Sequence, residues 1–161
     1  MALSSCGGCY KNNEWACTHW NDYPIEIAAT LDNEIDTIND LNEDLGFNLF
    51  QISDNGVPIL YLSHKEFNET VHPKASAYAE ANCSRRSGII TSGTIYLRGE
   101  KKYRIYEAFR NQFAHELIHL AGYFTHEDNG LMYTAAGKGY RGPLNDILSD
   151  ETINYLRGYY N

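Results

Sequence analysis

Apolar residues recur every three or four positions in two long stretches of the chain, a spacing that predicts two helices with one apolar face each. The first covers residues 30–45 and is followed by Gly46, a common stop signal. The second covers residues 103–120 as a half-buried helix, and Gly122 follows where a chain leaving a helix often needs a positive φ. A third helix is expected to begin near Ser149, which is a good N-cap residue.

Strands are predicted where apolar and polar residues alternate or where β-branched residues cluster. They cover residues 23–28, 47–53, 57–63 and 89–98, the last as one strand or as two that are broken at Ser92-Gly93. The segment 64–88 is rich in small and polar residues and is predicted to be irregular. The order of these elements predicts an α+β fold.

Composition and charge agree with one compact domain. The chain has 161 residues, of which 43% are hydrophobic and 21% charged, and this is typical of globular proteins. The net charge of −8 argues against nucleic acid as a partner, and no apolar run is long enough for a transmembrane helix. The first helix carries six acids, which we interpret as a solvated face, with calcium binding as the minor alternative. They are Asp32, Glu34, Asp36, Asp40, Glu43 and Asp44.

The second helix ends in the sequence His-Glu-Leu-Ile-His, which is the most informative pattern in the chain. His115 and His119 are four residues apart, so both imidazoles project from one face of the helix and can reach a single metal ion. Glu116 lies beside the first histidine, where it is expected to act on a metal-bound water. Three imidazoles with one open position are typical of a catalytic zinc site, so we predict one zinc ion.

This segment resembles the metzincin clan of zinc endopeptidases, and the matrixins in particular. His115 and His119 match the first two ligands, Gly122 matches the turn glycine, and Leu131-Met132-Tyr133 resembles the Met-turn with Met132 as a floor beneath the ligands. Residues 148–156 resemble the final matrixin helix, and residues 93–97 resemble an edge strand of that fold. The resemblance implies a small domain in which a twisted mixed sheet packs on the active-site helix and a second helix, with a C-terminal helix at the end.

The chain departs from that signature at the third ligand. The family's spacing would place it at Thr125, whereas the histidine comes one residue later, at His126. Imidazole is a common zinc ligand and neutral threonine is a poor one, so we assign His126. A ligand at Glu151 is the alternative, and it would make the site gluzincin-like. Glu127 or Asp128 could also bind the ion, but we interpret them as solvated loop acids.

The resemblance implies an endopeptidase in which Glu116 is first general base and then general acid. It also implies that an extended peptide pairs with Thr94, Ile95, Tyr96 and Leu97 by strand addition, although a plain sheet strand explains that segment equally well. Tyr133 and the loop 134–143 would wall the substrate pocket. A binding or structural module that keeps the zinc and the fold is the second hypothesis, and intact Glu116 argues against it.

Four cysteines leave several possibilities open. Residues 1–21 are predicted to form a cysteine-containing N-terminal segment, and residues 22–161 a single catalytic domain. Disulfides are expected if the protein is exported, and Cys6, Cys9 and Cys17 with a nearby histidine could instead form a closed zinc site. Leu3-Ser4-Ser5-Cys6 also resembles a bacterial lipobox, so Cys6 is a candidate lipid anchor and the protein is expected at the cell surface or outside the cell.

Overall fold

The computed structural model describes residues 17–71, 75–84, 86–99, 106–132 and 146–161. Within these ranges the chain forms a mixed α+β fold, which confirms the predicted class. The strands are β1 (His19–Trp20), β2 (Ile25–Ile27), β3 (Phe50–Ile52), β4 (Ile59–Leu62), β5 (Ala77–Cys83) and β6 (Ile89–Arg98). The helices are α1 (Asp32–Leu45), α2 (His64–Thr70), α3 (Tyr106–Leu120) and α4 (Asp150–Tyr160).

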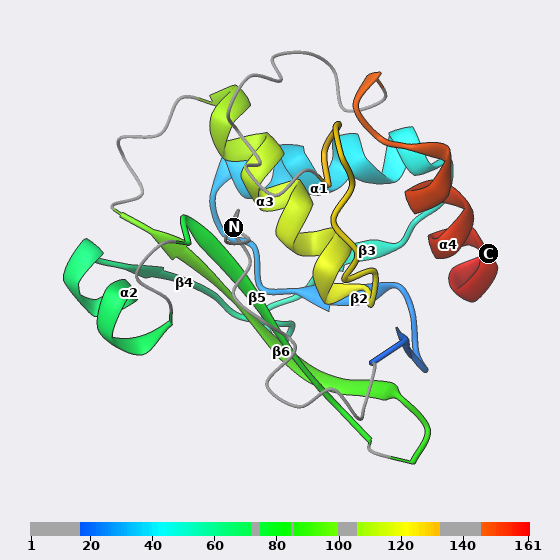
Figure 1. The fold of residues 1–161 in the computed structure, drawn as a ribbon, viewed down its shortest axis with the longest axis horizontal. Coiled ribbons are helices and arrows are strands. Elements are labelled where there is room, and N and C mark those ends of the chain that lie inside the picture. The colour runs from blue at the N-terminus through cyan, green and yellow to red at the C-terminus, as the bar shows by residue number, and fades with distance from the viewer. Residues whose placement is uncertain (1–16, 72–74, 85, 100–105, 133–145) are drawn as a thin grey trace.

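The long strand β6 organises the main sheet. It pairs with β5 in antiparallel orientation on one side, and with β1 and β4 in parallel orientation on the other. The second sheet is the parallel pair β2–β3. A bridge between Ile27 and Val57, just before β4, joins the two sheets, so the strands form one continuous layer beneath the helices (Figure 1).

Two predictions about the middle of the chain are wrong. Residues 64–88 are not irregular, because α2 and the whole of β5 lie there. The predicted edge strand at residues 94–97 is not found, because Ile95, Tyr96 and Leu97 lie between β5 and β4, while Thr94 pairs with β5. With strands on both sides, Ile95, Tyr96 and Leu97 are not placed to align a substrate by strand addition.

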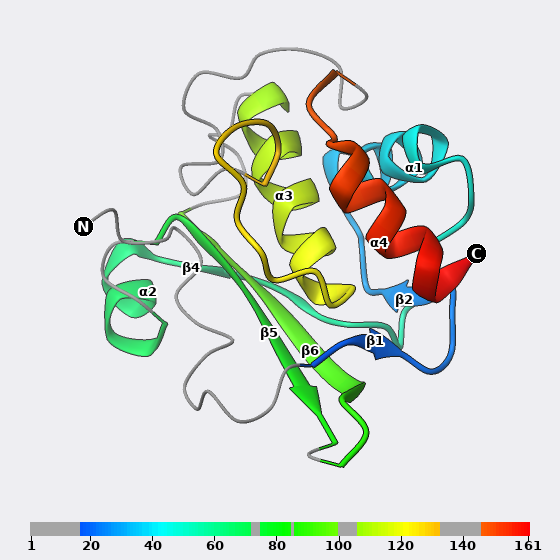
Figure 2. The same cartoon turned by 45° about the vertical axis from the view of Figure 1, so that its right-hand side comes forward.

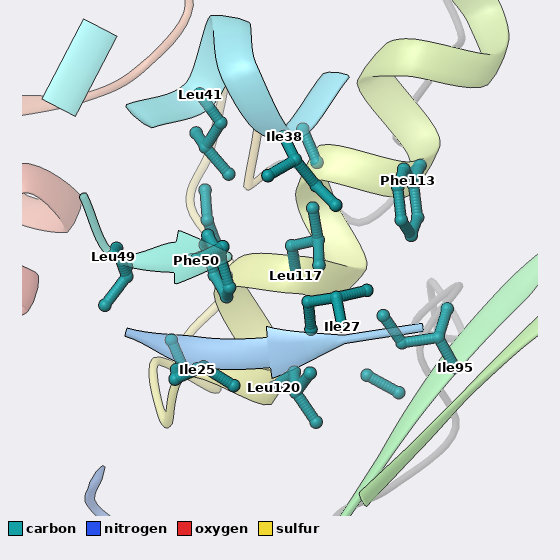
Figure 3. Close-up of a cluster of buried hydrophobic side chains, with 14 of the residues drawn as sticks. Ile25, Ile27, Ile38, Leu41, Leu49, Phe50, Ile95, Phe113, Leu117 and Leu120 are labelled. Atoms are coloured by element: carbon teal, nitrogen blue, oxygen red, sulfur yellow. The ribbon is translucent and has the colours of Figure 1, made fainter. Parts of the chain in front are cut away.

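Three helices pack on one side of the strands, and α2 lies apart at the far end of the sheet, beside β4 (Figure 2). Between them and the sheet lies a core of buried side chains from α1, α3, β2, β3 and β6 (Figure 3). Figure 3 labels Ile25, Ile27, Ile38, Leu41, Leu49, Phe50, Ile95, Phe113, Leu117 and Leu120. Helix α3 therefore lies in the middle of the domain, between α1 and the sheet.

Helix α1 ends as predicted, but one of its six acids does not face solvent. Gly46 has φ of +78° and caps the helix with its N–H on the Asn42 and Glu43 carbonyls. Glu34 is 1% exposed and so does not belong to the solvated face. Its carboxylate accepts hydrogen bonds from the backbone N–H groups of Thr30 and Leu31 and from the Tyr61 hydroxyl, which compensate for its desolvation.

Residues 17–20 are joined firmly to the sheet, although the sequence places them in the N-terminal segment. Cys17 forms a disulfide with Cys83 at the end of β5, and β1 pairs with the start of β6. The disulfide takes Cys17 out of the proposed second zinc site, while Cys6 and Cys9 lie outside the described residues. None of the helices within those residues is long and apolar enough to cross a membrane.

Candidate metal centre

Helix α3 carries the first two histidines into the interior. His115 is 0% exposed and His119 is 2% exposed, and every residue from Asn111 to Leu120 is buried. The prediction of a half-buried helix is therefore wrong for this stretch, because α1, β5 and β6 all pack against α3. Two imidazoles at such depth need polar partners to offset their lost hydration.

One ring nitrogen of each buried histidine already has its partner. Nδ1 of His115 lies 2.6 Å from the Leu131 carbonyl oxygen, and Nδ1 of His119 lies 2.8 Å from the Tyr123 carbonyl oxygen. A carbonyl oxygen only accepts, so both Nδ1 atoms carry the proton and donate. The Nε2 atoms are left with their lone pairs, which is the tautomer that a metal-binding histidine needs.

The third imidazole meets the other two from the loop after α3. Ligand atoms of His115, His119 and His126 all lie within 4.8 Å of one another, and Nε2 of His126 is 3.1 Å from Nε2 of His119. Two nitrogens bound to one tetrahedral zinc at 2.0–2.1 Å lie about 3.3 Å apart, so the observed spacing fits a shared ion. The three histidines could hold a metal ion, as the sequence predicted.

The residues that compete for the third position lie elsewhere. Thr125 is exposed, and Glu151 is an exposed residue in the first turn of α4. Neither belongs to the cluster, and within the described ranges no other group of histidines, cysteines and acids has its ligand atoms close enough to hold an ion. A six-acid calcium site on α1 therefore gains no support from this structure.

Burial keeps the cluster neutral. Desolvation lowers the pKa of His115 to about 4, against a weaker opposing effect of its hydrogen bond to Leu131. Desolvation also lowers the pKa of His119 well below its ordinary value, and the two neighbouring histidines lower it further. The pKa of His126 is lowered by its partial burial. Uncharged imidazoles are the form that binds a metal, so the site needs little deprotonation at neutral pH.

Of the other predicted site residues, some lie within the described residues and some do not. Glu116 follows His115 in α3 and is 2% exposed, so it is buried in the interior of the domain. Met132 is 1% exposed, and the carbonyl of the preceding residue, Leu131, holds His115. The segment 121–132 folds back along α3 in both views (Figures 1 and 2). Tyr133 and the loop 134–143 lie outside the described residues.

Gly122 makes the turn between the second and third ligands, as predicted. Its φ is +106°, and a Cβ atom there would lie 2.0 Å from the Thr18 carbonyl oxygen. Both the backbone conformation and the close approach of Thr18 exclude a side chain at this position. The Tyr155 hydroxyl lies 2.9 Å from the Thr18 oxygen and 3.0 Å from the Gly122 oxygen, which ties the two backbones together.

Sequence reasoning missed the aromatic residues that satisfy the last carbonyls of α3. Trp20 donates from Nε1 to the Leu120 oxygen at 2.8 Å, and the Tyr160 hydroxyl donates to the Ala121 oxygen at 2.6 Å. These carbonyls have no partners within the helix. No local pattern reveals such donors, because they come from β1 and from the end of α4.

The interpretation of Glu127 as a solvated loop acid is also wrong. It is partly buried, and its carboxylate accepts hydrogen bonds from the side chains of Ser149 and Thr152 at the start of α4. It also accepts one from Tyr123 in the ligand loop, which is the segment 121–132 that carries His126. A signal for this was present in the sequence. Ser149 and Thr152 begin the last helix, and hydroxyl groups at a helix N-terminus commonly pair with an acid.

No family model, curated protein or solved structure matches this chain. The geometry of the site therefore carries the functional argument by itself. It provides three neutral imidazoles that converge, two of them oriented by backbone carbonyls. The residue that follows the first of them in the sequence, Glu116, is a buried acid.

Proposed function

We propose that this protein is a zinc-dependent endopeptidase related to the metzincins. The single observation that carries the proposal is the convergence of His115, His119 and His126, with Glu116 next to the first of them. The mixed α+β order of elements, with a central helix that bears the ligands and a final helix after the loop, supports the same proposal.

The donor set favours zinc. Three imidazoles suit zinc among the common biological cations, while magnesium and calcium prefer oxygen ligands. With three protein ligands the fourth position is left for a water molecule, which separates a catalytic site from a closed structural one. When bound, zinc supplies a Lewis acid and lowers the pKa of its water toward about 7.

The chain's own residues supply the proton chemistry. In this proposal Glu116, the residue that follows His115, takes a proton from the attacking water and delivers it to the leaving amine. His115 and His119 are held by backbone carbonyls, so their orientation does not change during these transfers. The surrounding buried core keeps bulk water from competing for the carboxylate.

Proteolysis of a denatured protein by the full chain tests this function. With one equivalent of zinc the wild type should cleave the substrate, a chelator should stop cleavage, and added zinc should restore it. Glu116→Gln keeps the size of the side chain, so it should still bind zinc and lose cleavage by about 10²–10⁴-fold. Glu151→Gln, an exposed acid of α4, is the matched control and should retain full activity.

Two outcomes would contradict the proposal in different ways. A wild-type chain that binds zinc and cleaves no peptide would favour the binding-module hypothesis. Unchanged turnover in Glu116→Gln would leave the enzyme in place and remove the assignment of Glu116 as the base.

A further inference from the structure

Glu127, the residue after the third histidine, is held by an unusual concentration of hydrogen bonds. Three hydroxyl groups converge on its Oε1 atom, those of Tyr123 at 3.0 Å, Ser149 at 2.5 Å and Thr152 at 2.9 Å. A hydrogen bond to a charged acceptor is worth roughly 1.5–3 kcal/mol, more than one between neutral groups. Such a carboxylate has few other positions available to it.

Two of these donors belong to the start of α4. Ser149 is the N-cap, and its hydroxyl oxygen accepts the Thr152 backbone N–H at 3.0 Å while its proton is donated to Glu127. Thr152 is 0% exposed, so its hydroxyl group is satisfied by protein partners and not by bulk water. The positive end of the helix dipole further favours an anion here.

The backbone of Glu127 is fixed as well. Its N–H donates to the Met132 carbonyl oxygen at 2.9 Å. The carbonyl of the preceding residue, Leu131, accepts the hydrogen bond from Nδ1 of His115. Glu127 is therefore linked by its main chain to the segment that orients the first ligand, and by its side chain to α4.

His126 lacks the direct support that the other two ligands have. His115 and His119 each donate from Nδ1 to a carbonyl, whereas within the described ranges no hydrogen bond to Nδ1 of His126 is present. The ring is also only partly buried. Its Nε2 atom lies 3.1 Å from Nε2 of His119 and its ring stacks on His115. Outside these contacts within the cluster, its position depends on the backbone around it, which the adjacent Glu127 fixes.

We propose that Glu127 is a positioning residue, which holds His126 in the metal cluster by anchoring the ligand loop to Ser149 and Thr152 at the start of α4. The inference rests on the proposed zinc site and adds that metal affinity is coupled to the docking of α4. It also explains how a loop one residue longer than the metzincin signature delivers its histidine. The extra residue gives the loop more conformational freedom, and the anchor through Glu127 removes that freedom.

Metal affinity of the full chain tests the proposal without relying on activity. Zinc affinity is measured by competition with a chromophoric chelator, and cobalt serves as a second probe because its visible absorption weakens when tetrahedral coordination is lost. Glu127→Ala should weaken zinc binding by about 10- to 100-fold and reduce the cobalt absorption. Thr152→Val, which removes one donor and keeps the shape, should show a smaller loss in the same direction.

Controls separate positioning from a general loss of charge or stability. Asp128→Ala removes a neighbouring exposed acid and should leave zinc affinity and the cobalt spectrum unchanged. Glu127→Gln keeps an acceptor oxygen and should recover part of the affinity lost in Glu127→Ala. The double variant of Glu127→Ala and Thr152→Val should bind zinc as weakly as Glu127→Ala alone, because both changes break one interaction.

The outcomes distinguish this inference from the proposed function. If Glu127→Ala and Thr152→Val lower the melting temperature but keep wild-type zinc affinity and cobalt absorption, the residue is structural only and the positioning role is overturned. In that case a wild type that binds zinc leaves the metal centre intact. If Glu127→Ala does not fold, Thr152→Val and Glu127→Gln decide the matter, and wild-type affinity in both overturns the proposal. A wild type that binds neither ion removes the metal centre and this inference with it.

Discussion

Trp20 donates a hydrogen bond from its indole nitrogen to the carbonyl oxygen of Leu120, which lies 100 positions away in the sequence and 2.8 Å away in space. Leu120 is the last residue of the helix that carries two of the three histidines. Strand β1 thus supports the end of helix α3, which carries His115 and His119, directly. Stability of the site is for this reason expected to depend on residues that touch no ligand.

Trp20→Phe tests that support. It keeps an aromatic ring and leaves the buried Leu120 carbonyl without its donor, so the free energy of unfolding should fall by about 1–3 kcal/mol. Tyr159→Phe is the control, because its side chain is 43% exposed, and a change of within about 0.5 kcal/mol is expected. Urea denaturation of both variants measures the difference, and equal stabilities would show that the bond is unimportant.

Gly122→Ala should be among the most damaging single changes. The new Cβ would face the Thr18 backbone at 2.0 Å, and φ of +106° is strained for any L-residue, so a loss of about 3 kcal/mol or more is expected. Gly158→Ala is the matched control, since nothing lies within 4 Å of a Cβ there. In the helix α4 that change should stabilise the protein by about 0.5–1 kcal/mol. Thermal unfolding of the two variants should therefore shift in opposite directions.

The disulfide between Cys17 and Cys83 closes a loop across 66 positions. Replacing both cysteines by serine should lower the free energy of unfolding by about 4 kcal/mol, because the unfolded chain gains conformational freedom. The wild type measured with a reductant should approach the stability of the variant. If reductant has no effect on the wild type under conditions that expose its thiols, the link does not contribute as described.

The metal-free protein should lose stability as the pH falls. The pKa of His115 is about 4 in the folded state against an ordinary 6.5, so between these values the unfolded chain binds a proton that the folded chain does not. The free energy of unfolding is therefore highest above pH 6.5 and falls by roughly 3 kcal/mol as the pH falls toward about 4. Urea denaturation across this pH range should show the loss of stability. In His115→Asn the free energy of unfolding should depend less steeply on pH.

His64→Asn provides the control for that measurement. His64 is exposed at the start of α2, so its replacement should leave the pH dependence of the wild type unchanged. A wild type whose stability is constant between pH 6.5 and 4 would contradict the burial of neutral histidines.

The histidine cluster could be predicted because the information is local. A spacing of four on a helix fixes the relation of His115 to His119, and the glycine and the next histidine follow within seven positions of His119. The chemistry of imidazole then selected His126 over Thr125. The structure brings these three side chains together.

Other features could not be predicted, because they depend on distant parts of the chain. The alternation in β5 is carried by Ala77 and Ala79, which are buried but have weak strand propensity, so the strand gave little signal. Helix α2 buries a single large side chain, Phe67, and is too short for a clear helical period. The position of β6 between two strands depends on pairing with β5, so a missed β5 made β6 look like an edge.

The central claim is that three imidazoles bind one divalent ion, and equilibrium dialysis with elemental analysis tests it most directly. The wild type should hold about one zinc per chain, and His126→Ala should bind zinc at least about 100-fold more weakly, since loss of an outer partner alone costs 10- to 100-fold. A wild type without zinc, or a His126→Ala variant with unchanged affinity, would contradict the account.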